Sequence, residues 1–244
     1  MKKTFRNAVK KWGQGLLFGF RQSHNQFELL QLQSKIYYQA SRHTMGLRGD
    51  YLEFGVYMGR TLAEACELDR VVYDLHKQMW PRTKPHDSRY FGFDSFEGIP
   101  EIKGKDIGGA FAKGDYAASR SKVTEYLKRR EIDMTRVELV EGWYENSCTE
   151  ETRAKFGLEK ARVIHIDCDL YESTVTALNF ITPLVQTGTI IMFDDYFHFH
   201  GDRRKGEACA FREWLERNPQ IVATEFMRDL PWRNSFILTD MNDE

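Results

Sequence analysis

The strongest constraint on the fold is a pair of short apolar stretches that each run into acidic residues. The first, residues 161–169, reads Ala-Arg-Val-Ile-His-Ile-Asp-Cys-Asp, and the second, residues 189–195, reads Thr-Ile-Ile-Met-Phe-Asp-Asp. Apolar, β-branched runs of this length are typical of buried strands in a parallel sheet. Ligands bind at the carboxyl edge of such sheets. The sequence therefore predicts that four carboxylates converge beside one pocket: Asp167, Asp169, Asp194 and Asp195.

Carboxylates gathered at one edge repel one another. The repulsion is relieved either by a hard cation with oxygen ligands or by protonation that follows a raised pKa. Aspartates at strand ends also cap helices, and this alternative stays open for Asp169. It is weaker for Asp194 and Asp195, because both directly follow a buried strand. The pattern favours a cation site.

Alternating strand and helix patterns predict a doubly wound α/β domain with a mostly parallel sheet. Besides the two stretches above, strands are expected at 51–54, 90–94, 136–142, 220–226 and 235–238, the last of them antiparallel. Helices are expected from about 61 to 75 and at 119–130, 173–184 and 207–217. A chain of 244 residues can bury one good core, which favours one domain at 49–244 after a helical extension at 1–48.

The extension is basic and amphipathic. Residues 1–27 hold six Lys or Arg and no acid, with apolar residues at helical spacing, and a second helix is expected at 27–43. The commoner arrangement for such a segment is packing on its own domain or on a second subunit, which would give a homo-oligomer. The alternatives are a lid over the substrate and a helix on a membrane surface.

Charge and composition exclude several classes of protein. A formal net charge of -1 gives no overall attraction to nucleic acid or to anionic membranes. No apolar run approaches the roughly 20 residues that span a bilayer, and residues 15–20 are too short and too glycine-broken for a signal-peptide core. Four cysteines without CxxC spacing do not make a disulfide framework. We expect a cytoplasmic protein with no nucleic-acid partner and no stable membrane insertion.

Glycines and an acid mark the cofactor half of the pocket. Gly55 and Gly59 follow the first strand, where glycine lets the backbone pass close to a ligand at a helix N-terminus. Their spacing misses the Gly-x-Gly-x-x-Gly pattern that a nicotinamide-dependent reductase, one alternative, would need. Asp94 ends the second strand, where an acid either accepts the ribose hydroxyls of a nucleotide-like cofactor or caps a turn. Trp143 could stack on an adenine or simply pack.

The loop at 101–118 is expected to be mobile and able to close over the pocket.

Four motifs in this order resemble the TylF/macrocin O-methyltransferase family, which has the class I S-adenosylmethionine-dependent fold. They are Leu52-Glu-Phe-Gly-Val-Tyr-Met-Gly, Gly92-Phe-Asp-Ser-Phe-Glu-Gly-Ile-Pro, His165-Ile-Asp-Cys-Asp-Leu-Tyr-Glu-Ser-Thr and Met192-Phe-Asp-Asp-Tyr. The resemblance runs from about residue 51 to 215. It implies a Rossmann-like sheet of seven strands and methyl transfer from S-adenosylmethionine to a hydroxyl of a small molecule. The acceptor it implies is a sugar of a glycosylated natural product or of a polysaccharide precursor, and the metal is Mg²⁺ or Mn²⁺. A protein that binds the cofactor without transferring its methyl group is an alternative.

The resemblance also implies roles for individual residues. Cofactor binding would fall to Glu53, Gly55, Tyr57, Gly59, Thr61, Asp94, Ser95, Gly142 and Trp143. The metal ligands would be Asp167, Asp194 and Asp195, with Asp167 also counted as catalytic. In the similar catechol O-methyltransferases, a lysine three residues after the first metal aspartate is the base, whereas this chain has Leu170. We therefore expect His198, three residues beyond Asp195, to accept the proton or orient the hydroxyl, with Asp167, Glu141 or solvent as alternatives and His200 as the weaker histidine.

Overall fold

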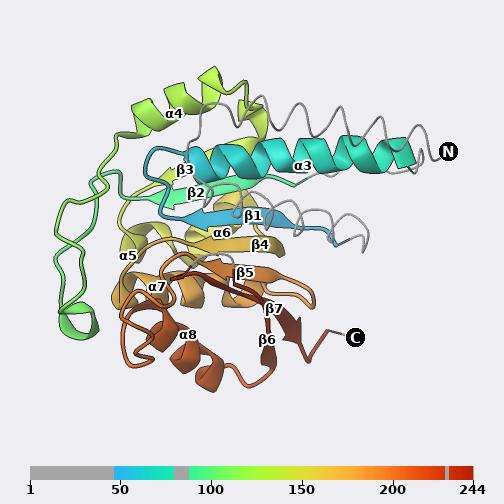
Figure 1. Cartoon of the computed structure of the whole chain (residues 1–244). Helices are drawn as coiled ribbons and strands as arrows, with labels where there is room; N and C mark the ends of the chain where they lie inside the picture. The colour runs from blue at the N-terminus through green and yellow to red at the C-terminus, as the bar shows by residue number, and fades with distance from the viewer. Residues whose placement is uncertain (1–46, 80–87, 229–230, 244) are drawn as a thin grey trace.

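The computed structural model describes residues 47–79, 88–228 and 231–243 (Figure 1). The two helices expected before residue 44, and with them most of the N-terminal extension, lie outside the described residues. The described part contains one seven-stranded sheet in the order β3-β2-β1-β4-β5-β7-β6. The strands are β1 (Asp50–Phe54), β2 (Tyr90–Asp94), β3 (Val137–Glu141), β4 (Ala161–Ile166), β5 (Ile190–Phe193), β6 (Ile221–Met227) and β7 (Asn234–Asp240).

The sheet is doubly wound. Strands β1 to β5 pair in parallel, and β7 pairs antiparallel with both β5 and β6. The predicted mostly parallel sheet with an antiparallel last strand is confirmed. The chain leaves β1 toward β2 and β3 on one side and returns to β4 and β5 on the other. The order of the strands therefore reverses between β1 and β4, and ligands bind at this point in open α/β sheets.

Six α-helices connect the strands within the described residues: α3 (Arg60–Met79), α4 (Arg120–Arg129), α5 (Tyr144–Ser147), α6 (Glu150–Phe156), α7 (Tyr171–Ile181) and α8 (Gly206–Arg217). Three helix boundaries differ from the sequence prediction by two residues or more. Helix α3 continues four residues past 75. Helix α7 begins two residues before 173 and gives way at Thr182 to a 3₁₀ turn that contains Pro183. Proline lacks the backbone N–H that would continue the α-helical pattern.

The strands alternate between two hydrophobic clusters, one on each face of the sheet. Leu52 of β1 and Ile164 of β4 belong to the larger cluster, which α7 and α8 cover with side chains such as Leu178 and Trp214. Their neighbours in β1 and β4 belong to the smaller cluster, which includes Leu62 of α3 and residues of α4. This period of two is what a sheet with both faces covered requires. Because both faces of the sheet are covered, ligands can reach the strands at their carboxyl edge.

Glycine is required where β1 ends. Gly55 has φ of +94°, and a Cβ atom built there would lie 1.7 Å from the carbonyl oxygen of Asp167. No side chain fits into that space. The backbone that follows β1 therefore lies directly against the backbone that follows β4, which brings the glycine turn beside the aspartates.

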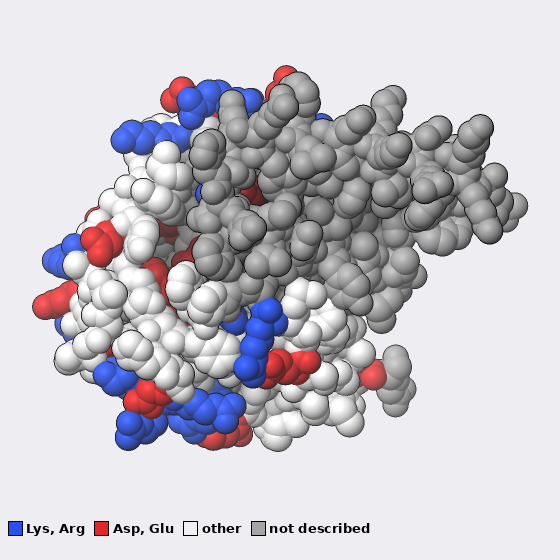
Figure 2. Space-filling view, in the orientation of Figure 1, with Lys and Arg blue, Asp and Glu red and all other residues white. Residues whose placement is uncertain are grey.

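Charged side chains of both signs lie on the surface of the described residues. In the view of Figure 2, basic and acidic side chains of the described residues lie next to each other rather than in one large patch of a single charge. All four cysteines are free thiols. Within the described residues, no helix is both long enough and apolar enough to cross a membrane.

Candidate active site

A cavity of about 940 Å³ opens at the carboxyl edge of the sheet. This is within the size range of pockets that hold small-molecule ligands. Its walls come from the ends of β1, β2, β4 and β5, from α5, and from the loops at 98–116, 197–200 and 231–232. Of the residues predicted from the sequence, the cavity is lined by Gly55, Tyr57, Asp94, Ser95, Trp143, Asp167, Asp194, Asp195 and His198.

The four aspartates converge as predicted, in two overlapping groups. Ligand atoms of Asp167, Asp169 and Asp195 lie within 4.8 Å of one another, and so do those of Asp167, Asp194 and His165. Asp167 belongs to both groups. The three predicted metal ligands are therefore divided between the groups, with Asp194 beside His165 and Asp195 beside Asp169.

The pKa values of Asp167, Asp169 and Asp195 are raised. Removal from water is the largest cause of the raised pKa of Asp167, and the charge of Asp194 adds to it. Desolvation likewise raises the pKa of Asp169 and of Asp195. Crowded carboxylates with raised pKa values and oxygen-only ligand atoms match what a hard divalent cation needs, because its charge offsets their repulsion. The Asp167, Asp169 and Asp195 group therefore fits Mg²⁺ or Mn²⁺.

Asp194 has two cationic neighbours of its own. Arg233, in the segment before β7, forms an ion pair with the Asp194 carboxylate, and Nε2 of His165 lies 3.7 Å from it. His165 is buried in β4, and its Nδ1 lies 3.6 Å from the carboxylate of Glu53. Burial opposes a charge on His165, but the nearby side chains of Asp194 and Glu53 outweigh it and raise the pKa of His165 to about 9.

Glu53 extends this chain of contacts into the interior of the protein. It is fully buried and accepts a hydrogen bond of 2.6 Å from the Tyr51 hydroxyl. Glu53 in β1, His165 in β4 and Asp194 directly after β5 thus form one row of contacts across three neighbouring strands. Neither His165 nor Arg233 was predicted as a site residue. A histidine inside a buried strand was the available signal for the first, because a buried ionisable group needs a partner.

Asp94 lines the cavity and at the same time holds the turn after β1. One carboxylate oxygen accepts the N–H groups of Val56 and Tyr57 at 2.8 and 3.0 Å, and the other accepts the N–H of Phe96 at 2.7 Å. The turn-capping alternative is therefore present in the structure. It is compatible with a second role, because each carboxylate oxygen can accept more than one hydrogen bond.

Four predicted cofactor residues lie outside the cavity wall. Glu53 is fully buried in β1, and Thr61 is in the first turn of α3. Gly59 has φ of +79°, and a Cβ atom there would lie 2.8 Å from the side chain of Val123, so this glycine serves the contact between α3 and α4. Gly142 adopts φ of +140° where β3 ends.

His198 faces the carboxylate cluster. Its Nδ1 lies 3.4 Å from Asp195, its Nε2 is 3.5 Å from the N–H of Ala110, and its ring stacks on Phe111 with 4.2 Å between the ring centroids. The loop after β5 therefore brings an imidazole to the acids, as predicted. His200 also lines the cavity but is exposed.

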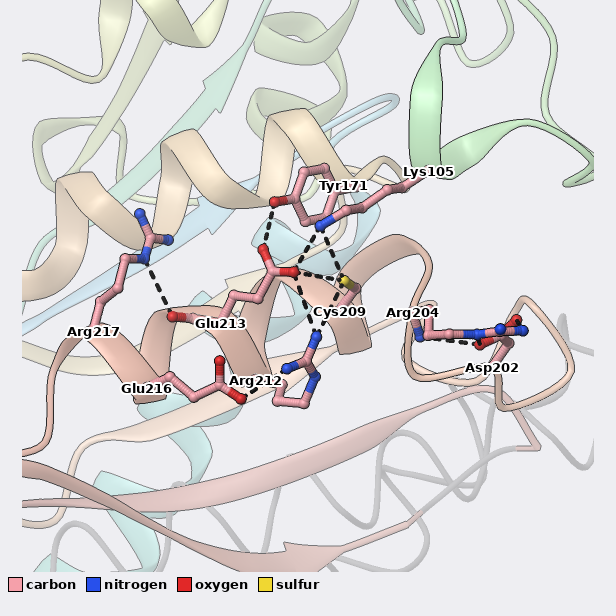
Figure 3. Close-up of polar contacts among 9 residues, drawn as sticks. All are labelled: Lys105, Tyr171, Asp202, Arg204, Cys209, Arg212, Glu213, Glu216 and Arg217. Atoms are coloured by element: carbon pink, nitrogen blue, oxygen red, sulfur yellow. Dashed lines mark hydrogen bonds and ion pairs between the residues drawn. The ribbon is translucent and has the colours of Figure 1, made fainter.

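The loop at 101–118 forms one wall of the cavity and is fastened to α7 and α8 (Figure 3). Asp106 is buried, and both of its carboxylate oxygens accept the N–H of Tyr171, at 2.8 and 3.0 Å. Lys105 donates to Glu213 of α8 at 2.7 Å, and the Tyr171 hydroxyl donates to the same carboxylate at 2.6 Å. The loop was predicted as a mobile cover, and the described structure shows its anchored end.

The strand order, the switch point and the cavity define the class I methyltransferase fold. The model of the macrocin-O-methyltransferase (TylF) family matches residues 31–216, and the chain belongs to this family. The predicted family and fold are both confirmed.

Two curated relatives come from Streptomyces. The 8-demethyl-8-(2,3-dimethoxy-alpha-L-rhamnosyl)-tetracenomycin-C 4'-O-methyltransferase of Streptomyces olivaceus is 27% identical over 62% of this chain and 54% of that protein. The demethyldecarbamoylnovobiocin O-methyltransferase of Streptomyces niveus is 27% identical over 61% of this chain and 53% of that protein. The matched part of the chain thus spans about half the length of these relatives.

A similar solved structure is that of the calicheamicin methyltransferase CalS11. It is 22% identical, covers 97% of this chain and 91% of its own, and has a TM-score of 0.68. Its apo structure, described as a TDP-rhamnose 3'-O-methyltransferase, has a TM-score of 0.60. At this identity the likeness establishes the fold.

Proposed function

We propose that this protein is an S-adenosylmethionine-dependent O-methyltransferase that methylates a sugar hydroxyl of a glycosylated small molecule. One observation carries the proposal. In a member of the macrocin-O-methyltransferase family, a cluster of carboxylates lies at the switch point of the sheet, inside a cavity of about 940 Å³. That volume is near the upper end of the range for small-molecule pockets, and we assign it to the cofactor and the acceptor together.

The curated relatives support the acceptor class. One is named for 4'-O-methylation of a rhamnosyl-tetracenomycin, and the other for O-methylation of demethyldecarbamoylnovobiocin. Both names describe methyl transfer to oxygen in a natural product. We extend this reaction to the present chain, with the sugar ring as the part of the acceptor that enters the cavity.

The cofactor would lie along the turn after β1 and the end of β2. Gly55 and Tyr57 form the wall there, Asp94 ends the second strand, and Trp143 follows the third. In this placement the carboxylate of Asp94 accepts hydrogen bonds from the ribose hydroxyls. It uses the lone pairs that are not already occupied by the three backbone N–H groups. Trp143 packs against the adenine.

The carboxylate cluster would hold Mg²⁺ or Mn²⁺, with Asp167 and Asp195 as ligands, Asp169 close to both, and Asp194 ligating from the second group. When bound, the cation supplies positive charge beside the acceptor hydroxyl and makes its deprotonation easier. Arg233 and His165 keep the Asp194 side chain in place.

His198 would move the proton. As the acceptor oxygen bonds to the methyl carbon, the bond from that carbon to the sulfonium breaks, and the sulfur leaves as the thioether of S-adenosylhomocysteine. The hydroxyl proton goes to the imidazole of His198. Asp195 lies 3.4 Å from Nδ1 and orients the ring, so that Nε2 is available once the contact with Ala110 opens.

Transfer of label tests the proposal. The full chain is incubated with methyl-labelled S-adenosylmethionine, Mg²⁺ and a panel of glycosides, and the products are separated by mass spectrometry. The proposal predicts that label appears on a sugar oxygen together with an equal amount of S-adenosylhomocysteine. Cofactor binding without transfer to any glycoside would favour the alternative of a binding protein.

A further inference from the structure

A fully buried glutamate contacts the backbone of the carboxylate cluster. Glu207 stands in the first turn of α8 and is 1% exposed. One of its carboxylate oxygens, Oε2, accepts the backbone N–H of Asp195 at 3.0 Å. The other, Oε1, is buried and has no hydrogen-bond partner among the described residues. Glutamate is almost never buried to this extent without a cationic partner, so its place in the fold needs a specific reason.

A glycine turn brings Glu207 to this position. Gly206 has φ of +52°, and a Cβ atom there would lie 2.6 Å from the ring of Phe199. The first turn of α8 therefore packs directly against the loop that follows β5. Acids in the first turn of a helix usually offset the positive end of the helix dipole, and that role needs no burial. Glu207 is buried and bonds to the end of β5 instead.

The N–H of Asp195 needs this acceptor because the sheet ends one residue earlier. Asp194 still donates its N–H to the carbonyl oxygen of Ile166 in β4, at 2.9 Å. The pairing of β5 with β7 stops before Asp195. A backbone N–H that is removed from water requires an acceptor, and the side chain of Glu207 supplies it.

The backbone of Asp195 is tied on its other side to the loop of His198. The carbonyl oxygen of Asp195 accepts the N–H of His198 at 3.0 Å, and its carboxylate lies 3.4 Å from Nδ1 of the same histidine. The position of this one peptide therefore decides where the Asp195 carboxylate points and where the loop with the imidazole begins.

We propose, resting on the cation site of the proposed function, that Glu207 is a positioning residue for the metal. Its hydrogen bond to the Asp195 N–H holds the Asp195 carboxylate where the cation binds. Groups that orient a metal ligand in this way typically contribute about 10- to 100-fold to metal affinity. The contact uses one carboxylate oxygen as a plain acceptor, so the role belongs to the hydrogen bond and not to the charge of Glu207.

Variants that separate reach from charge test the proposal. Glu207→Gln loses the charge but keeps an oxygen that can accept the Asp195 N–H. Glu207→Asp keeps the charge but is one methylene too short, and Glu207→Ala loses both. Binding of Mn²⁺ to the full chain is measured by electron paramagnetic resonance without cofactor or acceptor, so that the readout does not depend on turnover. We expect Glu207→Gln to stay within about threefold of wild type, and the other two variants to raise the Kd for Mn²⁺ at least about tenfold.

A second glutamate of the same helix provides the matched control. Glu216 pairs with Arg212 at 2.7 Å on the exposed side of α8, and Glu216→Ala should bind Mn²⁺ like wild type. The affinity for S-adenosylmethionine, measured by calorimetry, should be unchanged in every variant. Wild-type affinity for Mn²⁺ in Glu207→Ala, or an equal loss in Glu207→Gln and Glu207→Ala, would overturn the inference.

The same titrations keep the inference separate from the proposed function. Wild-type protein that binds Mn²⁺ as tightly as all three Glu207 variants refutes the positioning role and leaves the cation site standing. Wild-type protein that binds no Mn²⁺ refutes the cation site of the proposed function itself.

Discussion

Asp94 combines a structural contact with a proposed contact to the cofactor. Its carboxylate accepts three backbone N–H groups, including those of Val56 and Tyr57 in the turn that forms the cofactor wall. We expect Asp94→Ala to weaken binding of S-adenosylmethionine by about 1.5–3 kcal/mol, the range for hydrogen bonds to a charged group. Calorimetry measures the affinity, and a thermal melt shows whether the turn has also loosened. Wild-type affinity in this variant would remove Asp94 from the site.

His198 and His200 form a matched pair of residues on one loop. Only His198 lies beside Asp195, with Nδ1 at 3.4 Å. We expect His198→Ala to lower kcat by on the order of 100-fold with cofactor affinity unchanged, as loss of a positioned base does. His200→Ala is the control and should stay within about threefold of wild type, since a surface side chain contributes no proton transfer. An unaltered rate and pH profile in His198→Ala would assign the proton to Asp167, Glu141 or solvent.

At the residue scale, the four aspartates were predictable because each ends or closely follows an apolar strand. The partners that hold them were not. Glu53 meets His165 because β1 and β4 pair with these residues in register, and a register is set by tertiary packing rather than by local sequence. Arg233 reaches Asp194 from a segment 39 residues later in the chain, with no spacing rule to connect the two.

At the scale of elements, the junction of β1 and β4 depends on Gly55. We expect Gly55→Ala to lower the free energy of unfolding by at least about 3 kcal/mol, because the new Cβ would lie 1.7 Å from a backbone oxygen at a φ that only glycine adopts readily. Gly114→Ala is the control. It has φ of +85° but open space around the Cβ position, so it should cost only about 1 kcal/mol of backbone strain. The free energy of unfolding is measured in urea for both variants. Equal losses for Gly55→Ala and Gly114→Ala would show that Gly55 is not in close contact with the Asp167 carbonyl.

The anchor of the loop at 101–118 should make stability depend on pH. Burial raises the pKa of Asp106 from 3.8 to about 6, against the lowering effect of the Tyr171 N–H. Between these two values the folded state holds a proton that the unfolded state has lost, so this group stabilises the fold less as the pH rises from about 4 to 6. Asp106→Asn has no charge and can still accept the Tyr171 N–H.

Urea unfolding of wild type and Asp106→Asn at pH 4.5 and pH 7 tests this account of the anchor. We expect the unfolding free energy of the variant minus that of wild type to be more favourable to the variant at pH 7 than at pH 4.5. Wild type loses the stabilising contribution of protonated Asp106 as the pH rises, whereas the variant has no carboxyl there to titrate. The same difference between the two proteins at both pH values would show that Asp106 does not titrate in this window.

The elements were predictable where apolar periodicity is clear, as in all seven strands and in α4 and α8. Helices α5 and α6 were missed, because both are short and the first has four residues. Helix α6 is defined by its ends instead, with Thr149 capping its start and Gly157 ending it in a left-handed conformation. Such caps are recognisable in sequence only once a helix is suspected.

At the scale of the whole molecule, the sheet topology followed from the alternation of strands and helices and from the family resemblance. The shape of the cavity did not. Its rim brings together Tyr57, Tyr116 and Trp232, which lie on three segments far apart in the sequence. Only the closed fold shows that these exposed aromatics share one opening, and that no lysine or arginine of the described residues lines it.

The central claim is that the carboxylate cluster binds a cation that methyl transfer requires. The direct measurement is the rate of S-adenosylhomocysteine formation with an accepted glycoside, first in excess chelator and then as Mg²⁺ or Mn²⁺ is added back. Asp195→Asn is compared with Asp202→Asn, whose carboxylate pairs with Arg204 on the surface. The account predicts no turnover in chelator, full recovery with the metal, and a higher metal requirement for Asp195→Asn alone, because a hard cation loses a charged ligand. Full activity in excess chelator would contradict it.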